Sequence, residues 1–435
     1  MPLSRRHFLG AAATAAAGTA IGVPVLGRRI APSDSLNFGL IGVNGMGWAN
    51  LNAHLTVPGV TCTSLCDVDA NVLGRRAAEL EQMTGKAPVT YGDYRRMLED
   101  PDLDFVVIAT PDHWHGLQMV HACEAGKDVY VEKPLANSIA ECQIMTRAAE
   151  RYGRVVQVGM WQRSNTHWQD AIAYVQAGHI GRVRLVKAWA YQGWMEPVPV
   201  QPDGPAPAGV DYDFWLGPAP KRPFNPNRFH FNFRWFWDYA GGLMTDWGVH
   251  IIDMVLLGMK ASAPKTVFAS GGKLAYPDDA SETPDTLQAL YEFDDFSMLW
   301  EHATGISNGP YGRNHGVAFI GNTGTLVVDR GGWEVIPEWK DGEAQTEAVP
   351  VREGKRTGPD PHAENFVACI KSRERTNAHV DSAANTAIVA HLGNISYKLG
   401  RKMSWNHDAH RFEDDEAANS MLKPTYREPW VLPRV

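Results

Sequence analysis

The chain has 435 residues, which is too long for one ordinary hydrophobic core and predicts at least two domains. Its formal net charge is −8 with no basic block after the first thirty residues, which argues against nucleic acid as a partner. The five cysteines lie apart, without the paired spacing of a disulfide framework or a zinc site, and no metal site is predicted.

Residues 1–34 have the layout of an export signal. Arg5-Arg6 precedes an uncharged run over 10–27 that is rich in Ala and Gly, as is typical of a twin-arginine signal. We therefore expect the twin-arginine export machinery as a partner and a periplasmic or otherwise exported location. Because the run approaches the roughly 20 residues that span a bilayer, an uncleaved membrane anchor is the alternative.

The segment 35–160 alternates apolar strands with helices. Apolar runs predict strands over 36–43, 60–68, 105–110, 128–131 and 154–159. Helical spacing predicts helices over 45–54, 71–83 and 117–124. Such alternation indicates an α/β domain with a doubly wound parallel sheet of Rossmann type.

The first predicted strand is followed by a glycine-rich turn that opens a helix, Gly42-Val43-Asn44-Gly45-Met46-Gly47. Glycine lets the backbone turn tightly and approach a pyrophosphate, while the helix N-terminus offers free N–H groups. Asn44 stands where glycine is usual, and asparagine tolerates a left-handed backbone well. Gly42, Asn44, Gly45, Met46 and Gly47 are therefore predicted to bind a dinucleotide.

Asp67 ends the second predicted strand, 20 residues after Gly47. A carboxylate at this distance can accept a hydrogen bond from the ribose 2′-OH, and it would repel a 2′-phosphate. NAD is accordingly predicted as the cofactor in preference to NADP. The alternative is that Asp67 only caps the turn that follows it.

Two further segments follow strand ends, where open α/β sheets bind ligands. Thr110-Pro111 and His115 follow the third strand, and Glu132-Lys133 follows the fourth. A proline at position 134 favours an extended backbone at Lys133 and aims its side chain away from the sheet. A lone lysine after a strand is more often a solvated surface charge.

Together with the glycine turn, these segments resemble the Gfo/Idh/MocA oxidoreductase family. The resemblance covers nearly the whole chain after residue 35, including 241–250 and 362–405. It implies NAD(P) in a Rossmann domain, with Thr110, Pro111, His115, Glu132 and Lys133 at the cofactor. It also implies a sugar or polyol substrate between this domain and an open-faced sheet domain, with Lys133 beside the reacting hydroxyl.

Residues 161–405 change to a pattern of alternating strands. They are predicted over 183–191, 266–271, 286–293, 296–302, 316–320 and 325–329, with a tight hairpin turn at 294–295. This indicates an α+β domain with a large, mostly antiparallel, open-faced sheet, through which we expect a homo-oligomer. An aromatic-rich excursion over 196–239 is a candidate lid, and the polar tail 406–435 is expected to wrap another surface or stay mobile.

Asp246, His250 and Asp253 are spaced so that a single helix over 244–257 would place them on one face. Oxidation of a secondary alcohol needs a base for the hydroxyl proton, and histidine suits this near neutral pH. Lys133 would steady the developing oxyanion. The alternative is a buried helix histidine satisfied by Asp246, whereas the family resemblance implies His250 as acid/base with Asp246 beside it.

The predicted walls of the substrate pocket follow the last Rossmann strand or precede that helix: Trp161, Gln162, Arg163, Arg234, Trp235 and Trp237. Aromatic faces suit the C–H surface of a sugar ring, and Arg and Gln hydrogen-bond its hydroxyls.

Three function classes fit the chain. The first is an oxidoreductase with tightly held, internally recycled NAD, because an exported enzyme finds little free NAD. The second is a glycoside hydrolase that works by oxidation, elimination, hydration and reduction. The third is a non-catalytic sugar sensor, which would have no need of Lys133, Asp246 and His250.

Overall fold

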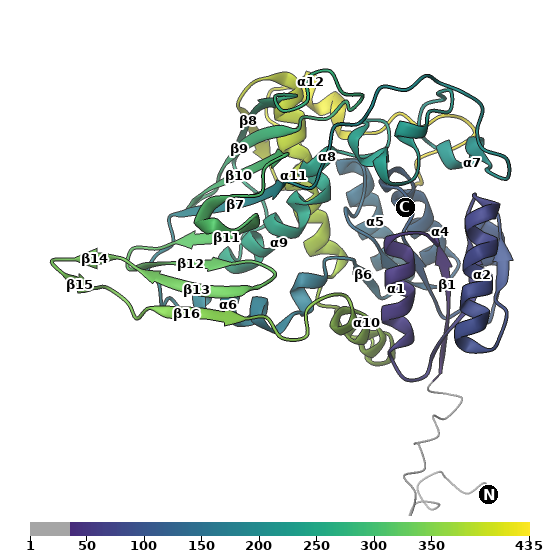
Figure 1. Cartoon of the computed structure of the whole chain (residues 1–435), viewed down its shortest axis with the longest axis horizontal. Helices are drawn as coiled ribbons and strands as arrows, with labels where there is room; N and C mark the ends of the chain where they lie inside the picture. The colour runs from purple at the N-terminus through teal and green to yellow at the C-terminus, as the bar shows by residue number, and fades with distance from the viewer. Residues whose placement is uncertain (1–34) are drawn as a thin grey trace, which may run out of the picture. The chain divides into compact units, whose positions relative to one another are not determined.

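Two large β-sheets organise residues 35–435, the part of the chain that the computed structural model describes (Figure 1). The predicted export signal lies outside these residues. Within them, no helix combines the length and apolar character needed to cross a membrane.

The first sheet has six parallel strands in the order β3-β2-β1-β4-β5-β6. They are β1 (Leu36–Ile41), β2 (Val60–Cys66), β3 (Val89–Tyr91), β4 (Phe105–Ile108), β5 (Asp128–Val131) and β6 (Val156–Val158). The strand order reverses between β1 and β4, and such a switch point opens a crevice at the carboxyl ends of the strands. The predicted Rossmann architecture is confirmed. Strand β3 was missed because it has three residues, none of them buried, and so shows no apolar run.

Helices cover this sheet: α1 (Met46–Leu55), α2 (Ala70–Thr84), α3 (Tyr94–Leu98), α4 (Asp112–Glu124) and α5 (Ile139–Tyr152). Asp69 caps α2 and Ser138 caps α5 through side-chain acceptors for backbone N–H groups. Helix α4 starts at Asp112, five residues earlier than predicted, because Pro111 presets the backbone and Asp112 suits a first turn.

A helix from much later in the chain, α10 (Asp360–Ser372), completes this core. Its Phe366 ring packs edge-on against Phe105 of β4, with ring centroids 5.4 Å apart, and against Tyr130 of β5. The hydrophobic core of the first sheet therefore depends on residues more than 200 positions away.

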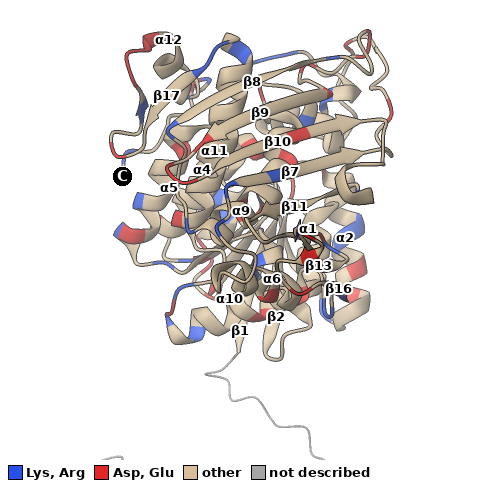
Figure 2. Cartoon of the chain, turned by 90° about the vertical axis from the view of Figure 1, so that its left-hand side faces the viewer, with Lys and Arg blue, Asp and Glu red and all other residues tan. Residues whose placement is uncertain are grey.

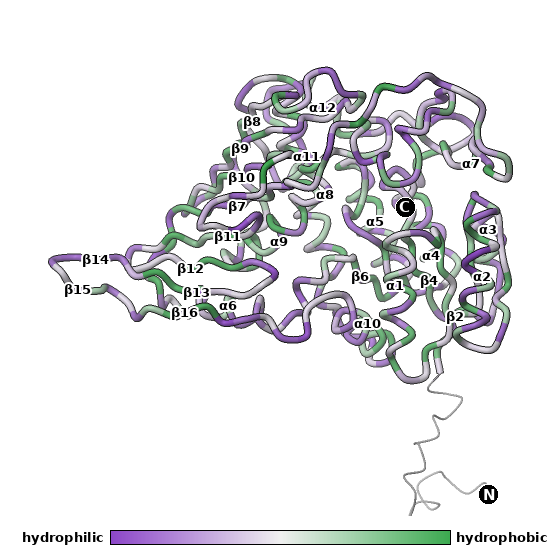
Figure 3. Tube along the Cα trace, viewed as in Figure 1, coloured by the Kyte–Doolittle hydropathy of each residue, from purple (hydrophilic) through white to green (hydrophobic). Residues whose placement is uncertain are grey.

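The second sheet has ten strands in the order β16-β13-β12-β11-β7-β10-β9-β8-β17-β18, and only β7 and β10 pair in parallel. The strands are β7 (Leu185–Gln192), β8 (Thr266–Gly272), β9 (Thr286–Glu292), β10 (Ser297–Thr304), β11 (His315–Ile320), β12 (Gly324–Val328), β13 (Gly332–Pro337), β16 (Val349–Glu353), β17 (Met403–Asn406) and β18 (Arg411–Phe412). The predicted hairpin at 294–295 joins β9 to β10. A separate hydrophilic hairpin is formed by β14 (Trp339–Lys340) and β15 (Glu343–Ala344) (Figure 3).

One face of this sheet packs on α6 (Thr166–Gln176), α9 (Gly248–Met259) and α11 (Val380–Leu399). On the opposite face, strands β7–β10 expose apolar residues, and most of the length of these strands is uncharged (Figure 2). Leu185, Phe268 and Leu290 are 42–52% exposed there. The described structure therefore has the open sheet face that the sequence predicts.

The excursion over 196–239 contains α7 (Tyr212–Leu216), η4 (Pro226–Arg228) and η5 (His230–Trp235). The C-terminal tail, with α12 (Glu416–Asn419), reaches both this excursion and the Rossmann part. Arg427 forms an ion pair with Asp213 at 2.9 Å, and Trp430 packs on Trp114 with ring centroids 4.9 Å apart. Of the two expectations for the tail, the structure shows the one that wraps another surface.

Candidate active site

A cavity of about 690 Å³ opens at the carboxyl ends of β1, β4 and β5. Its walls come from the glycine turn, the start of α4, the Glu132-Lys133 segment, the excursion and the junction of α8 (Gly242–Asp246) with α9. This is the place where doubly wound sheets bind ligands, and the volume is in the range of small-molecule sites.

The glycine turn forms a close-fitting cradle. Gly42 has φ of +84°, and a Cβ atom there would lie 2.7 Å from the Ala109 carbonyl oxygen. A Cβ on Gly47 would lie 1.9 Å from the Gly42 carbonyl oxygen. Gly45, at the N-cap of α1, makes no side-chain cap. The turn therefore accepts only glycine at 42 and 47 and leaves the helix N-terminus available to a pyrophosphate.

Asp67 lines the same cavity. Its carboxylate accepts hydrogen bonds from the backbone N–H groups of Val43 and Asp69, both at 3.0 Å. Burial raises the pKa of Asp67, and these two hydrogen bonds oppose the rise. The carboxylate thus ties the glycine turn to the next loop, while its predicted contact with a ribose stays a prediction.

Lys133 and Asp246 meet inside the cavity. Lys133 Nζ lies 2.5 Å from Asp246 Oδ1 and 3.0 Å from the Asp246 carbonyl oxygen. Arg234 Nε donates to the same Oδ1 at 3.2 Å. Burial by itself raises the pKa of Asp246, but the two cations outweigh it and lower the pKa to about 2. The carboxylate is therefore ionised at neutral pH and holds both cations in place.

His250 also lines the cavity, but Asp246 is not its partner. The predicted helix is divided at Trp247, whose backbone is still helical, into α8 and α9. The Asp246 carboxylate pairs with Lys133 and Arg234 instead of His250. Burial, then the charges of Lys133 and Arg330, lowers the pKa of His250 well below its usual value. Its buried Nδ1 has no hydrogen-bond partner. The ring is therefore neutral, and the satisfied histidine of the structural alternative is not what the structure shows.

His115 and Glu132, two of the predicted cofactor residues, form hydrogen bonds with segments that border the cavity. The two ring nitrogens of His115 lie 2.8 and 2.9 Å from the carbonyl oxygens of Pro134 and Thr110. Burial lowers the pKa of His115 to about 4, so the neutral ring donates a hydrogen bond to one of them. Glu132 Oε1 accepts from Asn50 at 2.9 Å. Thr110, Pro111 and Glu132 line the cavity, whereas His115 does not. His115 thus fixes the loop that carries Lys133.

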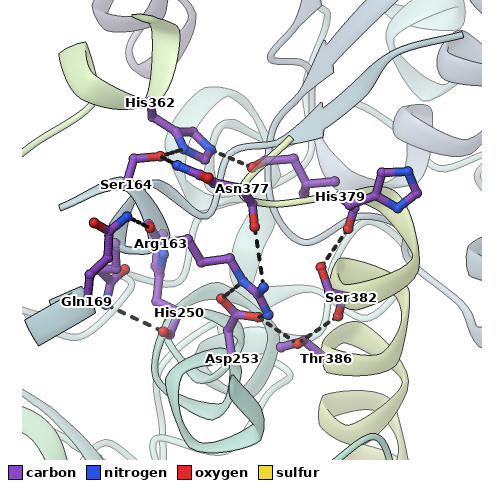
Figure 4. Close-up of polar contacts among 12 residues, drawn as sticks. Arg163, Ser164, Gln169, His250, Asp253, His362, Asn377, His379, Ser382 and Thr386 are labelled. Carbon is purple, nitrogen blue, oxygen red and sulfur yellow. Dashed lines mark hydrogen bonds and ion pairs between the residues drawn. The ribbon is translucent and has the colours of Figure 1, made fainter. Parts of the chain in front are cut away.

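Four predicted pocket walls do not line the cavity: Gln162, Arg163, Trp235 and Trp237. Arg163 binds Asp253 through two contacts of 2.7 Å beside Thr386 (Figure 4). This pair removes both Arg163 and Asp253 from the predicted site, since a buried guanidinium needs a charged partner.

Gln162 and Trp237 are held outside the cavity by their own hydrogen bonds. Gln162 donates to the His250 carbonyl oxygen at 3.4 Å, and Trp237 donates to the Glu282 carbonyl oxygen at 3.0 Å. Trp235 is likewise buried outside the cavity. Trp161 and Arg234 do line it.

The cavity has wall residues that sequence reasoning missed, among them Asp112, Trp194, Phe231, Trp247 and Arg330. Burial raises the pKa of Asp112 to about 7. Arg330 directly follows a predicted strand, and that position was a usable signal. Within residues 35–435, no group of three or more His, Cys, Asp or Glu side chains is arranged to hold a metal ion.

Family models match most of the chain. The model of the oxidoreductase family NAD-binding Rossmann fold matches residues 36–160, and that of the family's C-terminal alpha/beta domain matches residues 175–432. The chain belongs to the Gfo/Idh/MocA oxidoreductase family. It is therefore an enzyme of a family whose N-terminal domain binds NAD, and the cradle of Gly42 and Gly47 fits that cofactor.

Similar proteins within and around this family include sugar enzymes. A Glycosyl hydrolase family 109 protein of Shewanella putrefaciens is 31% identical over 171 residues, covering 34% of this chain and 37% of that protein. The alignment thus spans little more than a third of this relative.

Solved structures share the fold over a longer stretch. Levoglucosan dehydrogenase in complex with NADH and levoglucosan has a TM-score of 0.63 at 20% identity, covering 85% of this chain and 99% of that one. The WlbA dehydrogenase from Bordetella pertussis, in complex with NADH and UDP-GlcNAcA, has a TM-score of 0.61 at 19% identity, covering 86% and 99%.

Proposed function

We propose that the protein uses NAD to oxidise a secondary hydroxyl of a sugar or polyol to a ketone and to reduce a ketone back to a hydroxyl. The observation that carries this proposal is the meeting of Lys133, Asp246 and His250 in the cavity that the glycine turn also lines. The levoglucosan dehydrogenase fold match supports a sugar substrate. Asp67 at the ribose position supports NAD over NADP, because a carboxylate repels a 2′-phosphate.

NAD, when bound, supplies the acceptor and donor of hydride. Gly42, Gly45 and Gly47 would hold its pyrophosphate. The Lys133 ammonium, steadied by Asp246, donates a hydrogen bond to the substrate oxygen and stabilises the negative charge that develops there. The neutral His250 imidazole accepts the hydroxyl proton and later returns it.

A glycoside hydrolase that uses NAD transiently is the second candidate. The 31% identity to the Shewanella putrefaciens glycosyl hydrolase favours it. Both functions use the same base and oxyanion donor, so the site alone does not separate them. A reaction that reduces and reoxidises the same NAD molecule in each turnover also suits an exported enzyme, which finds little free NAD to exchange.

One assay distinguishes the two candidates. Purified protein is incubated with free sugars and with aryl glycosides, and NADH and released phenol are followed together. Accumulation of NADH, or interconversion of two sugars, supports the oxidoreductase. Release of phenol at a steady rate without net NADH supports the hydrolase. Absence of all these products with every substrate contradicts both.

The roles of Lys133 and His250 are tested by substitution. Lys133→Ala and His250→Ala should each reduce turnover roughly 10²–10⁴-fold while NAD stays bound. His302→Ala is the matched control, because His302 is a buried histidine outside the cavity whose loss should cost stability only. Full activity per folded molecule in His250→Ala would move the base to Lys133.

We further propose export through the twin-arginine route with NAD already bound, and self-association through the open face of β7–β10. Protein isolated from the periplasm should release NAD in near-stoichiometric amount on acid treatment. Empty protein that works only with added NAD would refute export of the loaded form. Leu290→Lys on the open face should shift the molecular mass measured by light scattering toward the monomer.

A further inference from the structure

Arg330 is held in a fixed position at the cavity wall. It follows β12 in the turn to β13, and its backbone N–H donates to His315 Nε2 at 3.4 Å. The preceding Asp329 accepts from the Gly332 N–H at 3.0 Å and pairs with Arg313 at 3.0 Å. Contacts with His315 and Arg313 thus fix the turn that carries Arg330.

Two tryptophan rings hold the Arg330 side chain. The guanidinium carbon lies 4.4 Å from the ring centroids of both Trp161 and Trp247, within the range of cation–π attraction. All three residues line the cavity. The aromatic contacts position the cation but take none of its hydrogen bonds.

The guanidinium has no anionic partner among residues 35–435. Its Nε is buried without a hydrogen-bond partner, and no carboxylate lies within ion-pairing distance. Arg163 shows the contrast: burial lowers its pKa, but the Asp253 carboxylate outweighs burial and raises it. For Arg330 burial dominates and lowers the pKa to about 10, which still leaves it charged at neutral pH.

The carboxylates of the cavity are engaged by cations other than Arg330. The Asp246 carboxylate acts on Arg330 from a distance, without contact. Asp246 Oδ1 already accepts from Lys133 and Arg234. The charges of Lys133 and Arg234 also act on the Glu132 and Asp112 carboxylates. Arg330, in contrast, contacts no carboxylate of the described residues, and a buried charge without a partner is costly.

We infer that Arg330 binds an anionic, oxygen-bearing substituent of the sugar substrate, the carboxylate of a uronic acid or a phosphate ester. This inference rests on the proposed function. The planar guanidinium fork matches both groups with paired N–H donors, and the tryptophan rings leave those donors without competing partners. Arg330 is thus a specificity-determining residue that selects charged sugars over neutral ones.

The test compares matched sugars on NAD-loaded protein. Dissociation constants are measured by calorimetry for glucose, glucuronate and glucose 6-phosphate, and for the corresponding galactose series, with NADH formation followed in parallel. At least one charged sugar should bind roughly 10–100-fold more tightly than its neutral parent. Preference for the uronate or for the phosphate identifies which anion the site takes.

Arg330→Met keeps the packing of the side chain and removes its charge. It should erase the preference while changing the affinity of the neutral parent less than about 3-fold, well below the expected effect of the charge. Arg352→Met is the matched control, since Arg352 lies over the Trp333 ring at 4.9 Å outside the cavity, and it should keep the preference.

Neutral sugars that bind or react as well as their charged derivatives in the unmodified protein would overturn the inference and leave the proposed function standing. Because this result needs no variant, poor folding of Arg330→Met does not affect it. A preference that survives in well-folded Arg330→Met would equally overturn it. Binding of no sugar at all, neutral or charged, would refute the sugar function and the inference together.

Discussion

Asp246→Asn tests whether the Asp246 carboxylate organises the active site. The substitution keeps the size of the side chain but removes the charge that holds Lys133 at 2.5 Å and Arg234 at 3.2 Å. The pKa of Asp246 falls from 3.8 to about 2, which at 1.36 kcal/mol per pKa unit corresponds to about 2 kcal/mol. If that energy serves to position Lys133 in the transition state, turnover should fall roughly 30-fold.

The lowered pKa of Asp246 also predicts how the stability of the protein depends on pH. Because folding lowers this pKa, the stabilisation is fully present above pH 3.8 and is lost as pH falls toward about 2. The difference in melting temperature between wild type and Asp246→Asn should therefore be constant from pH 5 upward and narrow below pH 4. Thermal melts across pH check this.

Asp253→Asn is the matched control, because Asp253 pairs with Arg163 outside the cavity. It should lower the melting temperature more than Asp246→Asn does, since breaking a fully buried ion pair costs about 3–5 kcal/mol. Its activity per folded molecule should be retained. Normal turnover in Asp246→Asn, or an equal loss of turnover in both variants, would refute the assignment of Asp246 to the active site.

Three more predictions follow from the geometry. Gly47→Ala should abolish NAD binding in calorimetry, because its methyl group would collide with a carbonyl 1.9 Å away, whereas Gly74→Ala, with nothing within 4 Å, should bind NAD normally. Asp67→Ser should weaken NAD and narrow its advantage over NADP in competition binding; equal affinities in the unmodified protein would contradict the reading of Asp67. Burial lowers the pKa of His302 and His391 from 6.5 to about 4. The unfolded state therefore binds more protons between these pH values, and the melting temperature should fall as the pH is lowered from 6.5 to 4. A melting temperature that does not change over this pH range would contradict the burial of both histidines in the neutral form.

Local sequence patterns were sufficient to predict the Rossmann sheet and the glycine turn that follows its first strand. The strand ends and the tight turn at Gly42 and Gly47 follow from constraints within a few residues, namely apolar runs and backbone contacts that exclude a Cβ atom. The antiparallel strands from β7 to β12 were predicted for the same reason, because strand periodicity is also local. Helix α10 was assigned to the second domain, since its packing on Phe105 depends on residues far away in the chain.

The candidate site divides in the same way. The resemblance to the family placed Lys133, Asp246 and His250 in one predicted site, because the local pattern around each residue also allowed a surface lysine and a buried helix histidine. Only the tertiary structure decided their partners: Lys133, 113 residues away in the chain, takes the Asp246 carboxylate, and His250 does not pair with it. It also withdrew Arg163 from the cavity and brought Arg330 into it. The physical reason is that ion pairing in a buried site depends on which charges the packing brings within a few ångströms, and no local pattern encodes that distance.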